Sequence, residues 1–173
     1  MTAPAGTGGS AGARRRGREC ALQILYALDV YPDATPDGAV TAFFQGGHGG
    51  ESGPAEPDAD SAGDDEGARA IDPVRAAEIA EFAGTLAKGT RSHLAAIDEL
   101  VQRVSRNWRL ERMARVDRNV LRLATYELVH AADVPVSVVL NEAIEIARRF
   151  GAAESPAFVN GILDRVAQEL ART

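Results

Sequence analysis

The sequence predicts an all-α fold, a helical bundle of about six to seven helices. Through most of the chain, apolar residues recur at intervals of three and four, which places them on one face of an α-helix. Proline and Ser-Pro steps stand where such patterns begin, as they do in the first turn of helices. No segment shows the alternation typical of a β-strand. The 173 residues are therefore expected to form one helical domain with short loops and one long insertion.

The first helix is expected from Arg14 to about Asp29. Its apolar stripe comprises Ala21, Leu25 and Leu28, widened by Cys20, Leu22 and Ile24. Residues 1–13 are Gly, Ala, Ser, Thr and Pro after the initiator Met, and they bury little surface, so we expect a flexible tail. A short helical turn is expected at residues 39–45. The domain itself is thus expected to span residues 14–173.

Residues 46–72 are rich in Gly, Ala, Pro and acidic residues, and we expect a disordered insertion between helices. The stretch from Gly46 to Gly67 has no Lys or Arg but seven acids, namely Glu51, Glu56, Asp58, Asp60, Asp64, Asp65 and Glu66. Without them the net charge of −6 would become +1, so basic residues can dominate one end of the folded part. A solvated linker is the preferred interpretation, and a regulatory role is the alternative.

The helices after the insertion begin at Pro73, which suits a first helical position. A long apolar stripe then runs to Val104 and is interrupted at Gly89, which predicts either one kinked helix or two joined helices. A further helix is expected from Asp117, as its N-cap, to about Ala131.

The last two helices have the clearest boundaries. Pro135 marks the start of one, and Gly151 is a typical C-terminal stop. Ser155 and Pro156 then predict an N-cap followed by proline at the first helical position.

Composition and motifs argue against an enzyme, a metal protein or a membrane protein. Cys20 is the only cysteine, so no disulfide or cysteine-rich metal site forms within one chain, which suits a reducing compartment. The histidines, His48, His93 and His130, are far apart in the sequence, and packing or solvation is preferred to a shared site. No catalytic signature, signal peptide or membrane-spanning apolar run is present. We expect a cytoplasmic, non-enzymatic protein without a cofactor.

The strongest local signal is the basic run, Arg14-Arg15-Arg16-Gly17-Arg18. Four guanidinium groups within five residues can bind several phosphates, and arginine offers bidentate geometry for them. Gly17 weakens the helix, so the run is expected to become ordered only on binding RNA. The alternative is a solvated basic tail that contacts nothing specific.

Aromatic residues on the later helices are weaker candidates. Phe158 follows a helix start, and its ring either packs in the core or stacks on an unpaired base. Trp108 and Tyr126 are expected to pack rather than to stack.

Charged residues on these helices are expected at the surface. Glu142 and Glu145 lie outside the apolar stripe of their helix, where a solvated face is preferred to a pair of catalytic acids. Asp117, Arg118 and Arg122 are also surface-patterned.

Three blocks together resemble the NusB family: ARRRGRECALQILYALD (residues 13–29), MARVDRNVLRLATYELVHAADVPVSVVLNEAIEIARRFG (residues 113–151) and ESPAFVNGILDRV (residues 154–166). The resemblance runs from Arg14 to about Leu170 and leaves out the acidic insertion. The order and spacing of the blocks are more specific than any one of them. This sequence departs from the family at Gly17 and in the long acidic connection.

The resemblance implies an all-helical bacterial protein of two subdomains that binds single-stranded boxA RNA together with NusE, a small-subunit ribosomal protein. That complex helps RNA polymerase read through terminators, notably in ribosomal RNA operons, and no reaction is catalysed. Carried over by position, the RNA-binding residues are Arg14, Arg15, Arg16, Arg18 and Phe158. The positions expected to face NusE are Tyr26, Asp117, Arg122 and Glu154.

Two rival interpretations stay open from the sequence. Some RNA methyltransferases carry a NusB-like helical domain before a catalytic domain, but no Gly-rich cofactor-binding segment follows here. The other is a self-associating interaction module, because some family members are expected to be homodimers that mask the RNA surface.

Overall fold

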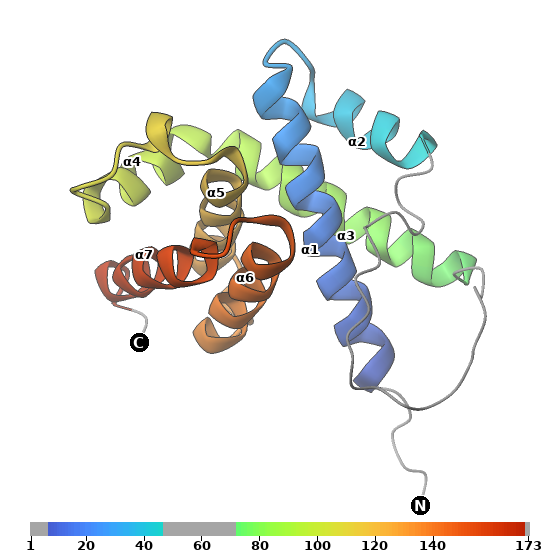
Figure 1. The fold of residues 1–173 in the computed structure, drawn as a ribbon. Coiled ribbons are helices and arrows are strands. Elements are labelled where there is room, and N and C mark those ends of the chain that lie inside the picture. The colour runs from blue at the N-terminus through green and yellow to red at the C-terminus, as the bar shows by residue number, and fades with distance from the viewer. Residues whose placement is uncertain (1–6, 47–71, 172–173) are drawn as a thin grey trace, which may run out of the picture.

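The structure, a computed structural model, describes residues 7–46 and 72–171, and within these ranges it is entirely helical (Figure 1). The elements are α1 (Thr7–Val30), α2 (Pro36–Gln45), α3 (Pro73–Ser92), α4 (Leu94–Val104), the 3-10 turn η1 (Leu110–Arg112), α5 (Arg115–His130), α6 (Val136–Phe150) and α7 (Ser155–Glu169). The all-α prediction is confirmed. The expected disordered insertion, residues 46–72, lies outside the described residues except at its two ends.

The helices enclose two hydrophobic cores, in agreement with two subdomains. The first core lies among α1, α2 and α3 and includes Ile24, Leu28, Ile79, Ala83 and Leu86. The second lies among α4, α5, α6 and α7 and includes Val101, Leu121, Val139, Val159 and Leu163. Helix α5 belongs to both, because Leu123 packs in the first core while Leu121 packs in the second. Helix α5 contacts α1, α6 and α7, and Figure 1 shows it beside α1 and above α6 and α7.

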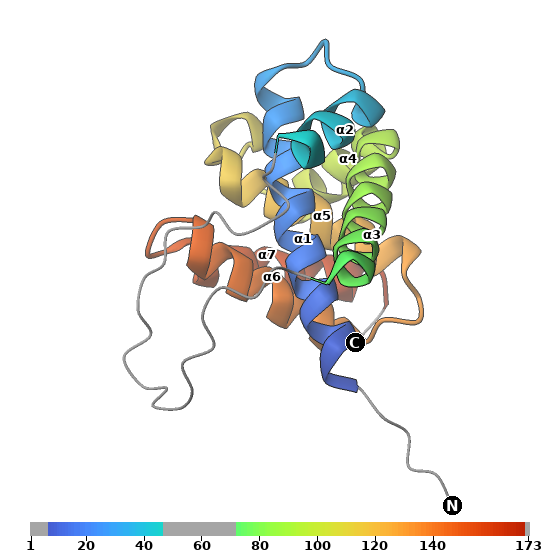
Figure 2. The same ribbon diagram turned by 90° about the vertical axis from the view of Figure 1, so that its right-hand side faces the viewer.

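Helix α1 begins at Thr7, so residues 7–13 are helical and not part of a tail as expected. It packs against α3, which crosses behind it in Figure 1 and lies beside it in Figure 2. Gly17 stands at the close approach of these helices, where a Cβ atom would lie 2.6 Å from Cδ1 of Phe82. The basic run is helical in the structure, and the position of Gly17 is too tightly packed for a larger residue.

The long stripe after Pro73 forms two joined helices, as one of the two alternatives predicted, but they meet at His93 and not at Gly89. Gly89 lies inside α3, and a Cβ atom there would lie 2.2 Å from the Tyr126 hydroxyl oxygen. The glycine thus accommodates a neighbouring ring. Tyr126 is half-buried and packs against both cores, which confirms that it packs.

Two expected N-caps differ from the structure. Helix α5 begins at Arg115 after Ala114, so Asp117 lies in its first turn, where a carboxylate favours the helix dipole. Helix α7 begins at Ser155, whose hydroxyl oxygen accepts a hydrogen bond from the backbone of Ala152, 2.9 Å away, before the helix. The predicted stop at Gly151 is confirmed as the C-cap of α6.

Candidate nucleic-acid interface

The basic run lies on the N-terminal half of α1, and the structure divides its four arginines. Arg14 and Arg15 are exposed and Arg16 is half-buried, whereas Arg18 is only 4% exposed. A helix turns by about 100° per residue, so consecutive arginines cannot all face the same surface. The sequence shows that four arginines are close together, but the packing of α1 determines which of them are exposed to solvent.

Arg18 points into the protein between α1 and α5. Its guanidinium group donates to both carboxylate oxygens of Glu127, through Nη2 at 2.7 Å and Nε at 2.9 Å. Glu127 is itself 2% exposed, and the Phe82 ring centroid lies 5.4 Å from the Arg18 guanidinium. This bidentate pair satisfies both charges, so Arg18 would have to leave its partner to contact a phosphate.

Two more arginines of the run are held by carboxylates. Arg15 donates to Glu142 on α6 at 2.7 Å, and the hydrogen bond and charge of Glu142 raise the pKa of Arg15. Arg16 donates to Glu19 at 3.0 Å, and Glu19 also accepts from Arg149 at 2.7 Å. The Glu142 side chain is only 14% exposed, which corrects the expectation that it lies on a solvated face. Part of the positive charge of the run is therefore neutralised within the protein.

Arg14 makes no ion pair within the described ranges. Its guanidinium group lies 5.8 Å from the centroid of the Phe82 ring, which leaves its donors free for another partner. The side chain of Arg15 is 55% exposed despite its pairing with Glu142. Arg14 and Arg15 are accordingly the two members of the basic run that are open to a phosphate.

Phe158, in the first turn of α7, is half-buried and packs against the second core. Its ring meets that of Trp108 edge-on, with 5.6 Å between the centroids. Trp108 is 58% exposed, so the expectation that it packs is wrong for most of its surface. The two rings form an aromatic pair that is anchored in the core at Phe158 and open to solvent at Trp108.

Two of the four positions expected to face a partner are accessible. Tyr26 is 40% exposed and lines an apolar pocket of about 360 Å³. The other residues lining this pocket are Leu22, Gln23, Phe43, Val116 and Phe150. Glu154 is exposed four residues beyond Phe150, in the connection to α7.

The other two positions are buried, which corrects their surface assignment: Asp117 is 8% and Arg122 is 9% exposed. Arg122 donates to both oxygens of Asp98 at 2.7 Å, and Arg118 donates to Asp29 at 2.5 Å. Burial would raise the pKa of Asp29, but Arg118 and Arg122 outweigh it and hold that pKa below its usual value. This network ties the end of α1 and helix α4 to α5.

His93 and His130, distant in the sequence, lie together, with 4.3 Å between the ring centroids. Burial and the neighbouring His93 lower the pKa of His130. No group of three or more metal-ligating side chains exists among residues 7–46 and 72–171. Cys20 is fully buried, as expected for a small core residue, and burial raises the pKa of its thiol.

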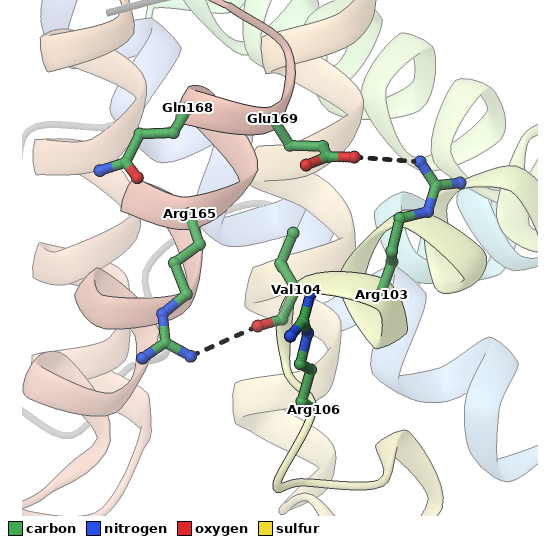
Figure 3. Close-up of a pocket in the computed structure, with 6 residues that line it drawn as sticks. All are labelled: Arg103, Val104, Arg106, Arg165, Gln168 and Glu169. Atoms are coloured by element: carbon green, nitrogen blue, oxygen red, sulfur yellow. Dashed lines mark hydrogen bonds and ion pairs between the residues drawn. The ribbon is translucent and has the colours of Figure 1, made fainter.

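The sequence analysis missed a second basic feature. Arginine occupies every third position from residue 103 to residue 118: Arg103, Arg106, Arg109, Arg112, Arg115 and Arg118. Arg103 lies in α4, Arg115 and Arg118 lie in α5, and the other three lie in the connection between these helices. At its beginning, Arg103, Arg106 and Arg165 line an open pocket of about 510 Å³, shown in Figure 3. The regular three-residue spacing of these arginines could have indicated this feature from the sequence.

Comparison with known proteins decides the family. The NusB family profile matches residues 15–168, nearly the whole described chain. The chain belongs to the NusB family. This is a family of transcription antitermination proteins that are not enzymes, which confirms the non-enzymatic expectation. None of the described helices has the length and apolar character needed to cross a membrane.

Relatives from bacteria are similar along almost their entire length. The transcription antitermination protein NusB of Sorangium cellulosum is 44% identical over 161 residues, covering 93% of this chain and 96% of the relative. That of Myxococcus xanthus is 43% identical over 159 residues, covering 92% of this chain and 97% of the relative.

Solved structures share the fold. The structure of T. maritima NusB matches with a TM-score of 0.68 and 32% identity, covering 98% of this chain and 94% of that chain. A chain in the crystal structure of a plectonemic RNA supercoil matches with a TM-score of 0.69 at 17% identity, which supports the fold alone.

Proposed function

We propose that this NusB-family chain binds boxA-type single-stranded RNA together with NusE, in the bacterial cytoplasm. There the complex joins RNA polymerase and supports read-through in ribosomal RNA operons. The observation that supports RNA binding is the exposure of Arg14 and Arg15 on α1. The other two arginines of the basic run, Arg16 and Arg18, are held by Glu19 and Glu127. Arg14, which has no ion pair among the described residues, and Arg15, which is exposed although it pairs with Glu142, are thus presented on a packed helix.

The arginines supply affinity, and the aromatic residues supply preference for unpaired bases. Phosphate contacts release counterions, so binding through Arg14 and Arg15 weakens as salt rises. A base stacked on a ring such as Phe158 must be unpaired, which favours single strands over duplexes. Arg18 serves this proposal by holding α1 against α5 and makes no phosphate contact itself.

The proposed partner surface centres on Tyr26. A tyrosine ring beside an open apolar pocket offers buried area together with a hydroxyl donor, the combination common in protein interfaces. Glu154 adds an exposed charge. Asp117 and Arg122 act indirectly in this proposal, because both are buried: Asp117 lies next to the pocket-lining Val116, and Arg122 ties α5 to Asp98 of α4.

The RNA part is tested with the variant Arg14→Ala/Arg15→Ala and a labelled boxA-type RNA. Affinity falls at least about tenfold, and the slope of log affinity against log salt decreases by about 1.4 for two lost single-strand contacts. Lys88→Ala/Arg91→Ala on α3 removes the same charge and serves as the control. Equal losses in both variants would show an unspecific charge effect and contradict the proposal.

The partner part is tested with Tyr26→Ala against Tyr31→Ala, both exposed tyrosines at the C-terminal end of α1. NusE binding weakens about tenfold or more in Tyr26→Ala, as expected for an interface tyrosine, and stays near the unchanged value in Tyr31→Ala. Calorimetric titration with purified NusE measures both. If Tyr26→Ala bound NusE with unchanged affinity, the proposal that the partner surface centres on Tyr26 would be contradicted.

A further inference from the structure

The connection between α4 and α5 together with the first residue of α5, residues 105–115, is called the arginine connector here. It contains Arg106, Arg109, Arg112 and Arg115 against one carboxylate, Glu111. All four arginines are exposed, and none of their guanidinium groups has a hydrogen bond or ion pair within the part of the chain that the structure describes. This contrasts with the basic run on α1, where carboxylates hold three of four arginines.

The arginine connector is fixed to the domain and not a loose loop. Leu110 and Met113 are buried in the second core at 6% and 7% exposure. The carbonyl oxygen of Trp108 accepts from the Ser105 hydroxyl at 3.1 Å and from the Gln102 amide at 3.2 Å. Trp108 is therefore held with its ring outward, and little conformational entropy is lost when a ligand covers it.

A basic pocket lies at the beginning of the connector (Figure 3). Arg165 donates to the carbonyl oxygen of Val104, and Arg103 donates to Glu169, which leaves Arg106 as the unpaired guanidinium of the pocket. In Figure 3 the side chain of Arg106 extends toward Val104, on the side where Arg165 approaches. Three arginines against one carboxylate suit an anionic group at this place.

Trp108 links the arginine connector to Phe158 because their rings are in edge contact at 5.6 Å. A strand whose base covers Phe158 would place its next base near the exposed face of Trp108. Phosphates on either side would then lie close to the arginines that flank the tryptophan, Arg106 and Arg109. Planar rings interleaved with unpaired arginines match the stacking and charge pattern of single-stranded nucleic acid sites.

We propose that Trp108 and the arginine connector form a second RNA-binding surface that takes the single strand beyond Phe158. This inference rests on the proposed function, since it needs an RNA that reaches Phe158. The occupant is single-stranded RNA and not an acidic polypeptide, because a carboxylate chain would use the arginines without using the outward ring. The surface lengthens the bound strand and adds affinity to the contacts of the basic run.

The first test uses the intrinsic fluorescence of Trp108, the only tryptophan in the sequence. The full chain is titrated with a boxA-type RNA extended at both ends by unrelated nucleotides. We expect the fluorescence to be quenched with the same midpoint as the anisotropy of labelled RNA. A duplex of the same sequence leaves the fluorescence nearly unchanged, because its bases are already stacked.

The second test compares matched variants in anisotropy titrations. Trp108→Ala binds the extended RNA at least about fivefold more weakly, while Trp108→Phe keeps most of the affinity because a ring remains. Arg106→Gln/Arg109→Gln lowers the salt slope by about 1.4, and Lys88→Gln/Arg91→Gln on α3 leaves it unchanged. Urea denaturation confirms that the variants remain folded.

The outcomes separate this inference from the proposed function. RNA binding that depends on Arg14 and Arg15 but leaves Trp108 fluorescence and the connector variants unaffected would overturn the second surface alone. Absence of RNA binding to the full chain, with or without NusE, would overturn both. If poly-glutamate quenched the Trp108 fluorescence with the same affinity as the RNA, the second surface would be assigned to an acidic protein partner and not to RNA.

Discussion

Arg18 and Glu127, which are 109 positions apart, form a bidentate ion pair inside the protein. The arginine side chain is 5% exposed and that of the glutamate 3%, so neither charge is hydrated. A buried pair of this kind adds little net stability by itself, yet loss of one partner leaves an uncompensated charge. Within the basic run, Arg18 therefore stabilises the fold, whereas Arg14 and Arg15 are accessible to a ligand.

Arg18→Ala is expected to lower the free energy of unfolding by about 3–5 kcal/mol, because Glu127 remains buried without its partner. Arg15→Ala, at an exposed neighbour, changes it by less than about 0.5–1 kcal/mol. Urea denaturation followed by circular dichroism measures both. Similar stabilities of the two variants would mean that Arg18 is not held as the structure describes.

Glu142→Gln is expected to raise RNA affinity by about threefold to tenfold, because it frees Arg15 and removes a negative charge beside the proposed phosphate path. Glu145→Gln, three residues further along α6 and paired with Arg148, is the control. Anisotropy titrations at constant salt compare the two. A loss of affinity in Glu142→Gln would show that the Glu142 contact orients Arg15 for RNA.

Gly89→Ala is expected to destabilise the protein by about 1–3 kcal/mol, because the new methyl group collides with the Tyr126 ring. Gly161→Ala on α7 is the matched control, since nothing lies within 4 Å of its added Cβ atom. There the higher helix propensity of alanine stabilises by about 0.5–1 kcal/mol. Thermal unfolding that gave the same sign for both variants would contradict this packing.

Stability is expected to fall as the pH drops from neutral through the range of free histidine, about 6.5 and below. The pKa of His130 is lowered in the folded protein, so the unfolded chain binds more protons there and is favoured by acid. His130→Asn removes part of this dependence. Urea midpoints at neutral and mildly acidic pH test it, and a wild-type midpoint that rises on acidification would contradict it.

Helix positions followed from the sequence because burial of one helix face imposes a short-range period. Pro73, Gly151 and Pro156 marked boundaries through local backbone chemistry, and the structure agrees to within a residue. The identity of the fold needed only these local signals and the family resemblance.

The site was less predictable because contacts between residues far apart in the sequence determine which of its side chains are exposed. Nothing near Arg18 in the sequence indicates Glu127, and nothing near Gly17 indicates the Phe82 ring that excludes a side chain there. Asp117 and Arg122 are buried although their residue types favour the surface. Trp108 is exposed because the turn around Ser105 directs its ring outward, which periodicity does not reveal.

The central claim is that this chain and NusE together recognise a boxA-type single strand. Its most direct test is fluorescence anisotropy with a labelled boxA-type RNA and a scrambled RNA, with and without NusE, across a salt series. The account predicts binding that NusE tightens, that rising salt weakens, and that the scrambled RNA loses. Equal or absent binding to both RNAs in the presence of NusE would contradict it.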